Sequence, residues 1–172
     1  MTVRRLQSED AEAYRALMLE GYERHPEAFT SSVAERAALP LAFWQGRLAA
    51  GADASEIVLG AFADGRLAGA AGLRFETREK ARHKCELFGM YVAPAGRRGG
   101  LGRALVEEAL ARARARPGVR LMQLTVTEGN RAAQALYEAC GFVPFGVEPY
   151  AVAMGPAFVS KVHMWCALGP LP

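Results

Sequence analysis

The sequence predicts an α/β fold in one domain that spans residues 1–172. A chain of 172 residues has the length of one ordinary domain and can bury about two-thirds of the surface that it exposes when unfolded. Segments with the alternation of β-strands are interleaved with segments of helical spacing. Hydrophobic residues make up 51% of the chain and charged residues 23%, which favours a folded core over a disordered chain.

The N-terminal third is expected to form a short strand and two helices. Residues 3–6 have the pattern of a strand, and Ser8 is expected to cap the first helix. A second helix is expected to begin near Pro40 and to end around Gly51, with residues 21–38 forming a loop between the helices. Each helix has one apolar stripe, which consists of Tyr14, Leu17, Met18 and Gly21 in the first and of Leu41, Trp44 and Leu48 in the second.

The middle of the chain is expected to form a hairpin, a third strand and a long helix. Residues 56–63 and 66–76 are apolar strand-like segments joined by Asp64-Gly65, a dipeptide that readily adopts the positive φ of a tight turn. Residues 85–92 form another strand, and a loop rich in Gly and Arg leads from it into a helix that ends at Pro117-Gly118. The apolar face of this helix consists of Leu101, Leu105, Val106, Ala109, Leu110 and Ala113.

The C-terminal part is expected to form a strand, a short helix and a closing pair of strands. Residues 121–127 alternate apolar and polar side chains, and residues 130–140 form an Ala-rich helix that Gly141 closes. Residues 142–146 and 159–168 are expected to pair, with a loop rich in Pro and Gly between them.

The loop that follows the third predicted strand combines glycine with arginine. Because the first N–H groups of a helix lack partners inside it and carry the positive end of its dipole, a glycine loop at this position suits an anion. A solvated turn is the alternative interpretation. A Walker phosphate loop would need Lys and then Ser or Thr after Gly102, and a dinucleotide fingerprint would need a third glycine at the position of Leu105. The residues of the loop are Gly96, Arg97, Arg98, Gly99, Gly100, Gly102 and Arg103.

Two ordered motifs identify a family resemblance. Residues 97–102 match the pattern R/Q-x-x-G-x-G/A at the start of a predicted helix, directly after the strand segment Met90-Tyr91-Val92-Ala93-Pro94. A second pattern, N-x-x-A-x-x-L-Y-x-x-x-G-F, is matched by Asn130, Ala133, Leu136, Tyr137, Gly141 and Phe142. Both resemble signatures of the GCN5-related N-acetyltransferase (GNAT) superfamily, the first being its coenzyme A signature. The clear resemblance covers about residues 85–145, and the two ends of the chain are less diagnostic.

The resemblance implies a GNAT-like fold, with a mostly antiparallel central sheet, one splayed strand pair and flanking helices. The strands at residues 85–92 and 121–127 would separate and leave backbone groups near residues 90–92 free to bind pantetheine. Acetyl-coenzyme A would be the acyl donor and a primary amine of a small molecule or peptide the acceptor, in a direct transfer. A non-catalytic acyl-coenzyme A binding or sensing module is the alternative. The implied binding residues are Met90, Tyr91, Val92, Arg97, Arg98, Gly99, Gly100, Leu101, Gly102, Arg103, Asn130 and Tyr137.

The resemblance also implies two catalytic candidates, Glu86 and Tyr137. Glu86 is spaced from the glycine loop much as the catalytic glutamate is in the histone-acetylating branch, and it would help to remove a proton from the amine; an ordinary strand glutamate is the alternative. Tyr137 would protonate the departing thiolate, or would pack its ring against pantetheine or the core. Ordered water and several other side chains remain open as bases, namely Glu76, Glu79, Glu128 and His83, whereas His25 and His163 have no motif support.

Charge and cysteine content limit the expected partners. The 21 basic and 18 acidic residues give a net charge of +3, which is too balanced to predict a nucleic-acid groove. Cys85, Cys140 and Cys166 are widely spaced, so we expect buried free thiols and neither disulfides nor a metal site. The sequence has no signal-like start and no apolar run of roughly 18 residues, so we expect a soluble cytoplasmic protein without membrane association. A homodimer is left open.

Overall fold

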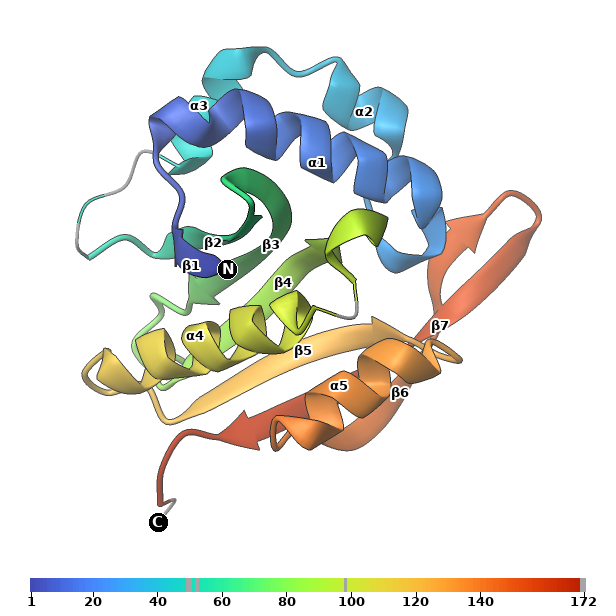
Figure 1. Ribbon diagram of the computed structural model, residues 1–172. Helices are drawn as coiled ribbons and strands as arrows, with labels where there is room; N and C mark the ends of the chain where they lie inside the picture. Colours follow the sequence, from blue (N-terminus) through green and yellow to red (C-terminus); the bar gives the residue numbers. More distant parts are fainter. Residues whose placement is uncertain (49–50, 52, 98, 171–172) are drawn as a thin grey trace.

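A mixed β-sheet forms the centre of the computed structural model, which describes residues 1–48, 51, 53–97 and 99–170 (Figure 1). Within these residues seven strands follow the order β1-β2-β3-β4-β5-β7-β6, and every neighbouring pair is antiparallel except β4 and β5. This arrangement confirms the predicted fold class. The strands are β1 (Thr2–Arg5), β2 (Glu56–Ala63), β3 (Arg66–Phe75), β4 (Lys84–Val92), β5 (Leu121–Thr127), β6 (Val143–Met154) and β7 (Ala157–Ala167). The helices are α1 (Ala11–Arg24), α2 (Val33–Ala37), α3 (Leu41–Leu48), α4 (Leu101–Ala115) and α5 (Arg131–Ala139), with 3-10 turns η1 (Ser8–Asp10), η2 (Pro26–Ala28) and η3 (Pro94–Gly96).

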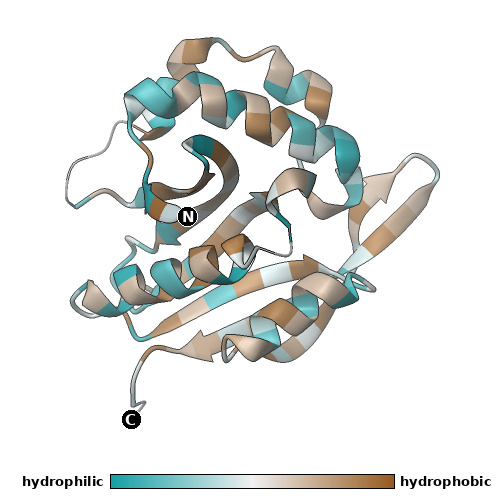
Figure 2. Ribbon diagram, in the orientation of Figure 1, coloured by the Kyte–Doolittle hydropathy of each residue, from teal (hydrophilic) through white to brown (hydrophobic). Residues whose placement is uncertain are grey.

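Helices cover both faces of the sheet because successive strand residues point to opposite faces. The helices α1 and α3 pack on one face, where Trp44 is fully buried in a cluster with Val58 and Ala70. The helices α4 and α5 pack on the other face, in a cluster that includes Leu59 and Met122. Figure 2 shows the apolar residues along the strands and on the inner sides of the helices. Two clusters on one sheet therefore fix the positions of the helix ends that surround the site.

Several predicted elements are confirmed. The β2–β3 hairpin turns at Asp64-Gly65, whose φ angles are 49° and 74°. The strand β5 has the predicted range, and α3, α4 and α5 lie within the predicted helical segments. Asn130 begins α5 by accepting a hydrogen bond from the N–H of Ala133 at 3.2 Å.

The start of the chain differs from the prediction in two respects. Ser8 does not cap α1, because it lies in η1; Asp10 stands at the N-terminus of α1 and accepts a hydrogen bond from the N–H of Gln7 at 2.8 Å. The segment expected as a loop, residues 21–38, contains the end of α1, η2 and α2. Its helix α2 begins with a capping box, since Ser32 and Glu35 each accept a hydrogen bond from the other's backbone N–H.

The expected loop between the last two strands is also wrong. The strands β6 and β7 continue through it as a long ribbon that pairs as far as Met154 and Ala157. Pro149, Gly155 and Pro156 suggested a loop, but only residues 155–156 form a turn. Pro149 lies on β6, the edge strand, where a missing N–H leaves no partner unpaired. Large apolar side chains of this ribbon are exposed, namely Val143, Phe145, Val147, Tyr150 and Phe158.

Candidate active site

The parallel strands β4 and β5 pair over a short stretch and then separate. Residues 84–86 of β4 pair with residues 121–123 of β5, whereas β4 stays paired with β3 as far as Val92. The backbone of β4 is irregular around Gly89, which has a φ of 57°. Figure 1 shows the resulting opening between β4 and β5, with α4 and α5 beside it. This is the splayed strand pair that the family resemblance implied.

One cavity lies between the end of β4, the N-terminus of α4 and α5, and we call it the glycine-loop cleft. Its volume is about 490 Å³. Gly100 directly precedes α4 with a φ of 78°, a left-handed conformation that favours glycine. A Cβ at Gly102 would lie 3.2 Å from Leu136 of α5, so a side chain there would crowd the contact between the two helices. The free N–H groups at the start of α4 therefore face an open site that suits an anion.

The predicted binding residues gather in the glycine-loop cleft. Gly99 belongs to the same loop without lining the cleft, and Arg98 lies outside the described residues. The predicted residues that line the cleft are Met90, Tyr91, Val92, Arg97, Gly100, Leu101, Gly102, Arg103, Asn130 and Tyr137.

Arg97 connects the glycine loop to the segment before η2. Its Nε donates to the carbonyl of Val92 at 3.1 Å, so the Arg97 side chain occupies one of the two acceptor positions of that oxygen. Its Nη2 lies 2.8 Å from Nε2 of His25, whose ring packs beside Tyr91. No motif marks His25 in the sequence, although the side chain lines the cleft.

Tyr137 of α5 is almost fully buried beside the opening. Its hydroxyl donates to Sδ of Met90 at 3.5 Å, and its ring packs against Phe142. Burial raises the pKa of Tyr137 to about 12, so the hydroxyl keeps its proton at neutral pH. The geometry therefore combines packing with an available O–H group.

A second cavity of about 320 Å³ lies between the split strands and the N-terminal helices, and we call it the arginine cavity. Tyr14 and Tyr22 of α1 line it, together with charged side chains from α2, α3, β3, β4 and β7. The charged residues are Arg36, Arg47, Arg74, Glu86 and Lys161. The two cavities adjoin, because they share the lining residues Ala28, Phe29, Met90, Asn130, Ala133 and Tyr137.

Glu86 lies at the last paired position of β4, where the strands begin to separate. Its Oε2 accepts a hydrogen bond from Arg74 at 3.0 Å, and its side chain is 44% exposed. Arg74 also binds Glu56, which in turn binds Arg47. Glu86 thus lines the arginine cavity. The other side chains that the sequence left open as bases line neither cavity, namely Glu76, Glu79, Glu128 and His83.

Lys161 is a buried cation that the sequence analysis missed. Only 7% of the residue is exposed, and its Nζ donates to the carbonyls of Glu27 and Ala28 and to the hydroxyl of Thr127 at 2.9–3.2 Å. Thr127 donates to the same Glu27 carbonyl at 2.9 Å. Burial lowers the pKa of Lys161. Together these bonds, which we call the Lys161 tie, hold η2 against β5 and β7.

The cysteines are free thiols that line neither cavity. Cys85 and Cys166 are buried and Cys140 is half-buried, and burial raises the pKa of Cys85 to about 12. Within the described residues, no group of three or more His, Cys, Asp or Glu side chains could hold a metal ion. None of the helices described is both long and apolar enough to cross a membrane.

Comparisons with known proteins agree with this geometry. The model of the Acetyltransferase (GNAT) family matches residues 12–142. A mycothiol acetyltransferase from Salinispora tropica is 32% identical over 133 residues, which is 77% of this chain and 41% of the relative. The chain thus spans about 41% of the length of the curated relatives that it matches, including the same enzyme from Salinispora arenicola.

Solved structures have the same fold. A GNAT-family acetyltransferase from Streptococcus pneumoniae is 28% identical, with a TM-score of 0.79 over 98% of this chain and 99% of that chain. The yncA protein from Salmonella typhimurium, solved with its cofactor acetyl-CoA, is 23% identical, with a TM-score of 0.80 over 100% of this chain and 96% of that chain. At 23% identity, the similarity to the yncA protein shows a shared fold and nothing further.

Proposed function

Because the chain belongs to the GNAT family of acetyltransferases, we propose that it transfers an acetyl group from acetyl-coenzyme A directly to a primary amine of a small molecule or peptide. The observation that carries this proposal is the wall shared by the two cavities. One cavity has a helix N-terminus and a glycine loop, and the other has a carboxylate. Two reactants that fill these cavities would meet beside Met90 and Tyr137, which line both.

The glycine-loop cleft is proposed to hold coenzyme A. The pyrophosphate would accept hydrogen bonds from the first N–H groups of α4, which Gly100 and Gly102 leave uncovered. Arg97 and Arg103 would add positive charge beside it. Pantetheine would then follow the open side of β4 and place the thioester near Tyr137. The presence of acetyl-CoA in the yncA structure supports a donor site in this fold.

Glu86 and Tyr137 are proposed to act as the general base and the general acid of the reaction. An alkyl ammonium has a pKa near 10, so the amine must lose a proton before it attacks the thioester carbonyl. Glu86 would accept this proton, directly or through water. As the new C–N bond is completed and the C–S bond breaks, Tyr137 would donate its proton to the sulfur. The nitrogen carries an extra proton after its attack and would release it through water to the Tyr137 phenolate, while Glu86 would pass its own proton to solvent.

We further propose that residues 1–172 form one acetyltransferase domain. The GNAT match covers most of the chain, and one continuous sheet carries both cavities. The mycothiol acetyltransferases are longer than this chain, so we propose their named activity only as one candidate reaction for it.

An acceptor panel tests the proposed function. Amino acids, polyamines, aminoglycosides and N-terminal peptides are supplied with acetyl-coenzyme A, and release of free thiol is followed. We expect release that depends on one class of amine, with the acetylated amine as product. Tight binding of acetyl-coenzyme A without release for any amine would instead identify a binding or sensing module.

A further inference from the structure

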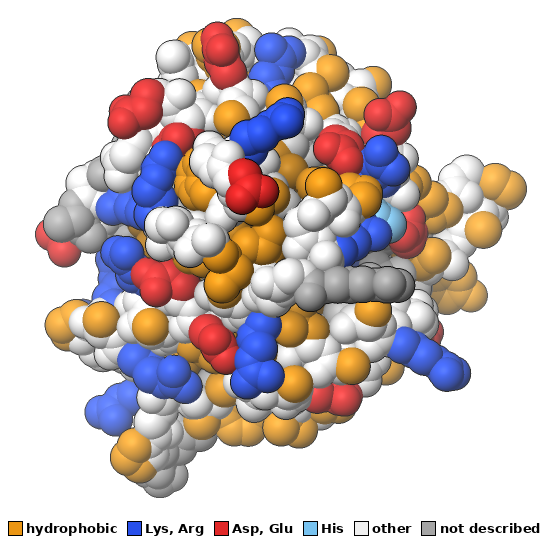
Figure 3. Space-filling model, viewed as in Figure 1, with side chains coloured by type: hydrophobic (Ala, Val, Ile, Leu, Met, Phe, Trp, Pro, Cys, Tyr) orange, Lys and Arg blue, Asp and Glu red, His pale blue; other side chains and the backbone are white. Residues whose placement is uncertain are grey.

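The arginine cavity is rich in positive charge. Four cations line it, whereas Glu86 is its single lining carboxylate among the described residues. On the outer face in Figure 3, by contrast, basic and acidic side chains are intermixed. Which of these cations is already neutralised decides what the cavity can bind. The four are Arg36, Arg47, Arg74 and Lys161.

Two of the four cations are already paired. Arg47 and Arg74 both bind Glu56, at 2.8 and 3.2 Å, and Arg74 also binds Glu86 at 3.0 Å. Both guanidinium groups also stack on Phe88. These two cations and two carboxylates balance one another, so this side of the cavity carries no excess charge.

The third cation, Lys161, has used its donors. Its three N–H groups have three acceptors in the Lys161 tie, none of which is a carboxylate. Its charge therefore contributes to the positive potential of the cavity, but the ammonium has no donor left for a ligand.

Arg36 of α2 differs from the other three. It is half-buried and stacks on Phe43, and within the described residues its guanidinium has no ion pair and no hydrogen bond. Five N–H donors are thus available in a planar arrangement that matches a carboxylate or a similar oxyanion.

Two tyrosine hydroxyls open into the same cavity. Tyr14 is 3% exposed and Tyr22 is 6% exposed, and neither hydroxyl has a hydrogen-bond partner among the described residues. A hydroxyl oxygen without a partner is either sealed inside the protein or accessible, and neither of these two oxygens is among the sealed polar atoms. Both hydroxyls are therefore accessible from the cavity that their side chains line. Burial raises the pKa of both, that of Tyr14 to about 12, with Arg36 acting on each in the opposite direction. Both hydroxyls therefore remain donors, and Arg36 lies within electrostatic reach.

We propose that the acceptor amine carries an anionic group, such as a carboxylate, which binds to Arg36 and to the hydroxyls of Tyr14 and Tyr22. This inference rests on the proposed function, because it names the class of amine. Within the part of the chain that the structure describes, this guanidinium and these two hydroxyls form a set of hydrogen-bond donors without an acceptor. A polyamine would instead bring further positive charge to unpaired cations, which is unfavourable. A cavity of about 320 Å³ is also of the size that small ligands occupy.

Matched acceptors test this inference. Phenylalanine, leucine and methionine are each compared with the amine that lacks the carboxylate and with the corresponding amide, by the kcat/KM of thiol release. We expect at least one amino acid to exceed both of its partners. In Arg36→Ala its kcat/KM should fall by roughly tenfold to a hundredfold, mainly through KM, because a hydrogen-bonded charge pair is lost. The decarboxylated amine should keep its value, and Arg36→Lys should recover part of the loss.

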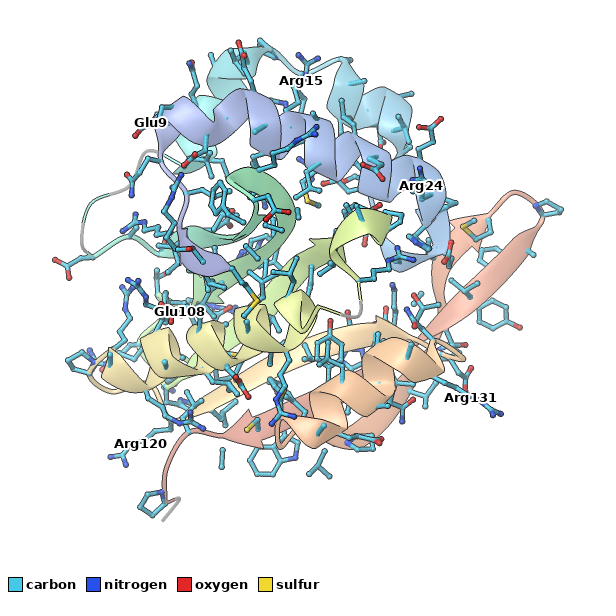
Figure 4. The ribbon with its side chains drawn as sticks, viewed as in Figure 1. Glu9, Arg15, Arg24, Glu108, Arg120 and Arg131 are labelled. Atoms are coloured by element: carbon cyan, nitrogen blue, oxygen red, sulfur yellow. The ribbon has the colours of Figure 1, made fainter. Side chains whose placement is uncertain are left out.

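One control and one further variant separate this role from a loss of structure. Arg120, which Figure 4 shows pointing away from the molecule, provides Arg120→Ala, a variant expected to react like the wild type. Tyr22→Phe removes one hydroxyl and should lower kcat/KM for the amino acid but not for the decarboxylated amine. The inference would be overturned if the amino acid and its partners without a carboxylate had equal kcat/KM. It would also be overturned if Arg36→Ala lowered kcat/KM equally for the amino acid and for the decarboxylated amine.

The result also distinguishes the two proposals. Efficient transfer to neutral or cationic amines, with acids unreactive, would overturn the anionic acceptor and leave the acetyltransferase reaction standing. Absence of thiol release with every amine, together with no binding of acetyl-coenzyme A, would overturn both.

Discussion

The glycine-loop cleft and the arginine cavity are built in opposite ways. The cleft is formed mainly by one continuous stretch, from the end of β4 through the glycine loop to the start of α4, with α5 beside it. The cavity takes its charged side chains from α2, α3, β3, β4 and β7, which lie far apart in the chain. Backbone N–H groups are the donors in the first, and side chains are the donors in the second. A ligand common to a family can be bound by a local motif, whereas a ligand specific to one member requires separate segments to meet.

The largest expected effect lies in the glycine-loop cleft. In Gly100→Val a β-branched residue would occupy a φ of 78°, so the backbone must shift and withdraw N–H groups from the pyrophosphate. Loss of two hydrogen bonds to a charged group, each worth about 1.5–3 kcal/mol, predicts at least a roughly hundredfold weaker affinity for acetyl-coenzyme A. Isothermal titration calorimetry measures this.

Gly118 provides the matched control, because its φ is 83°, a Cβ there would also meet no neighbour, and it lines neither cavity. Gly118→Val should lose thermal stability much as Gly100→Val does and should bind acetyl-coenzyme A normally. If the two variants bind it equally well, the glycine loop is not the phosphate site.

At the wall between the two regions, Tyr137→Phe should lower kcat by roughly a hundredfold, because it removes a general acid and conserves the ring that packs on Phe142. Affinity for acetyl-coenzyme A should be little changed. The exposed Tyr150, changed to Phe, is the control and should react normally. Near-normal kcat in Tyr137→Phe would leave this tyrosine a packing role only.

The pH dependence gives a second test of Tyr137. Its pKa is raised from an ordinary value near 10 to about 12, so the wild-type enzyme should keep its acid as the pH rises through 10. If the wild type instead loses kcat around pH 10 and Tyr137→Phe does not, the pKa of Tyr137 is not raised and the prediction is contradicted.

Within the arginine cavity, Glu86→Gln should lower kcat about tenfold, a modest effect because water can also accept the proton. The fall should grow as the pH decreases, since less of the amine is then deprotonated without help. Glu76→Gln is the control, because Glu76 also binds an arginine and lines neither cavity. A wild-type pH–rate profile in Glu86→Gln would remove Glu86 from the mechanism.

The smallest effect is expected outside both regions, at Asp10. Arg4 and the N–H of Gln7 donate to its carboxylate, and the Arg4 hydrogen bond is the main cause that lowers the pKa of Asp10. A lowered carboxyl pKa stabilises the fold above its unfolded value near 4, and this contribution disappears as the pH falls through the lower folded value. Asp10→Asn should therefore reduce the free energy of unfolding by about 1 kcal/mol at pH 7 and by less near pH 3. Urea unfolding at the two pH values measures this, and an equal loss at both would contradict it.

The contrast between the two regions also explains what the sequence could predict. Local rules suffice for the hairpin at Asp64-Gly65 and for a glycine loop at a helix start, because a few neighbouring residues determine the conformation. The capping box of Ser32 and Glu35 was also visible in the sequence, and attention to it would have placed α2. The strands within residues 147–158 were missed because the status of an edge strand depends on the whole sheet.

The cations of the arginine cavity could not be predicted in this way. Arg36 and Lys161 are separated by more than half of the chain, and neither belongs to a motif. What singles them out is a three-dimensional property. Among the described residues Arg36 has no ion-pair or hydrogen-bond partner, and Lys161 is buried. Such properties appear only when the partners of every neighbouring charge are known.

The Lys161 tie bears on how the specificity of such an enzyme could change during evolution. It fixes the carbonyls of Glu27 and Ala28, and Ala28 belongs to the wall that both cavities share. Arg36 lies on a separate short helix that takes no part in the tie. Substitutions on α2 could therefore alter which amine is accepted while the wall beside the thioester stays in place. New acceptors could then arise through single substitutions that leave the ancestral donor site intact.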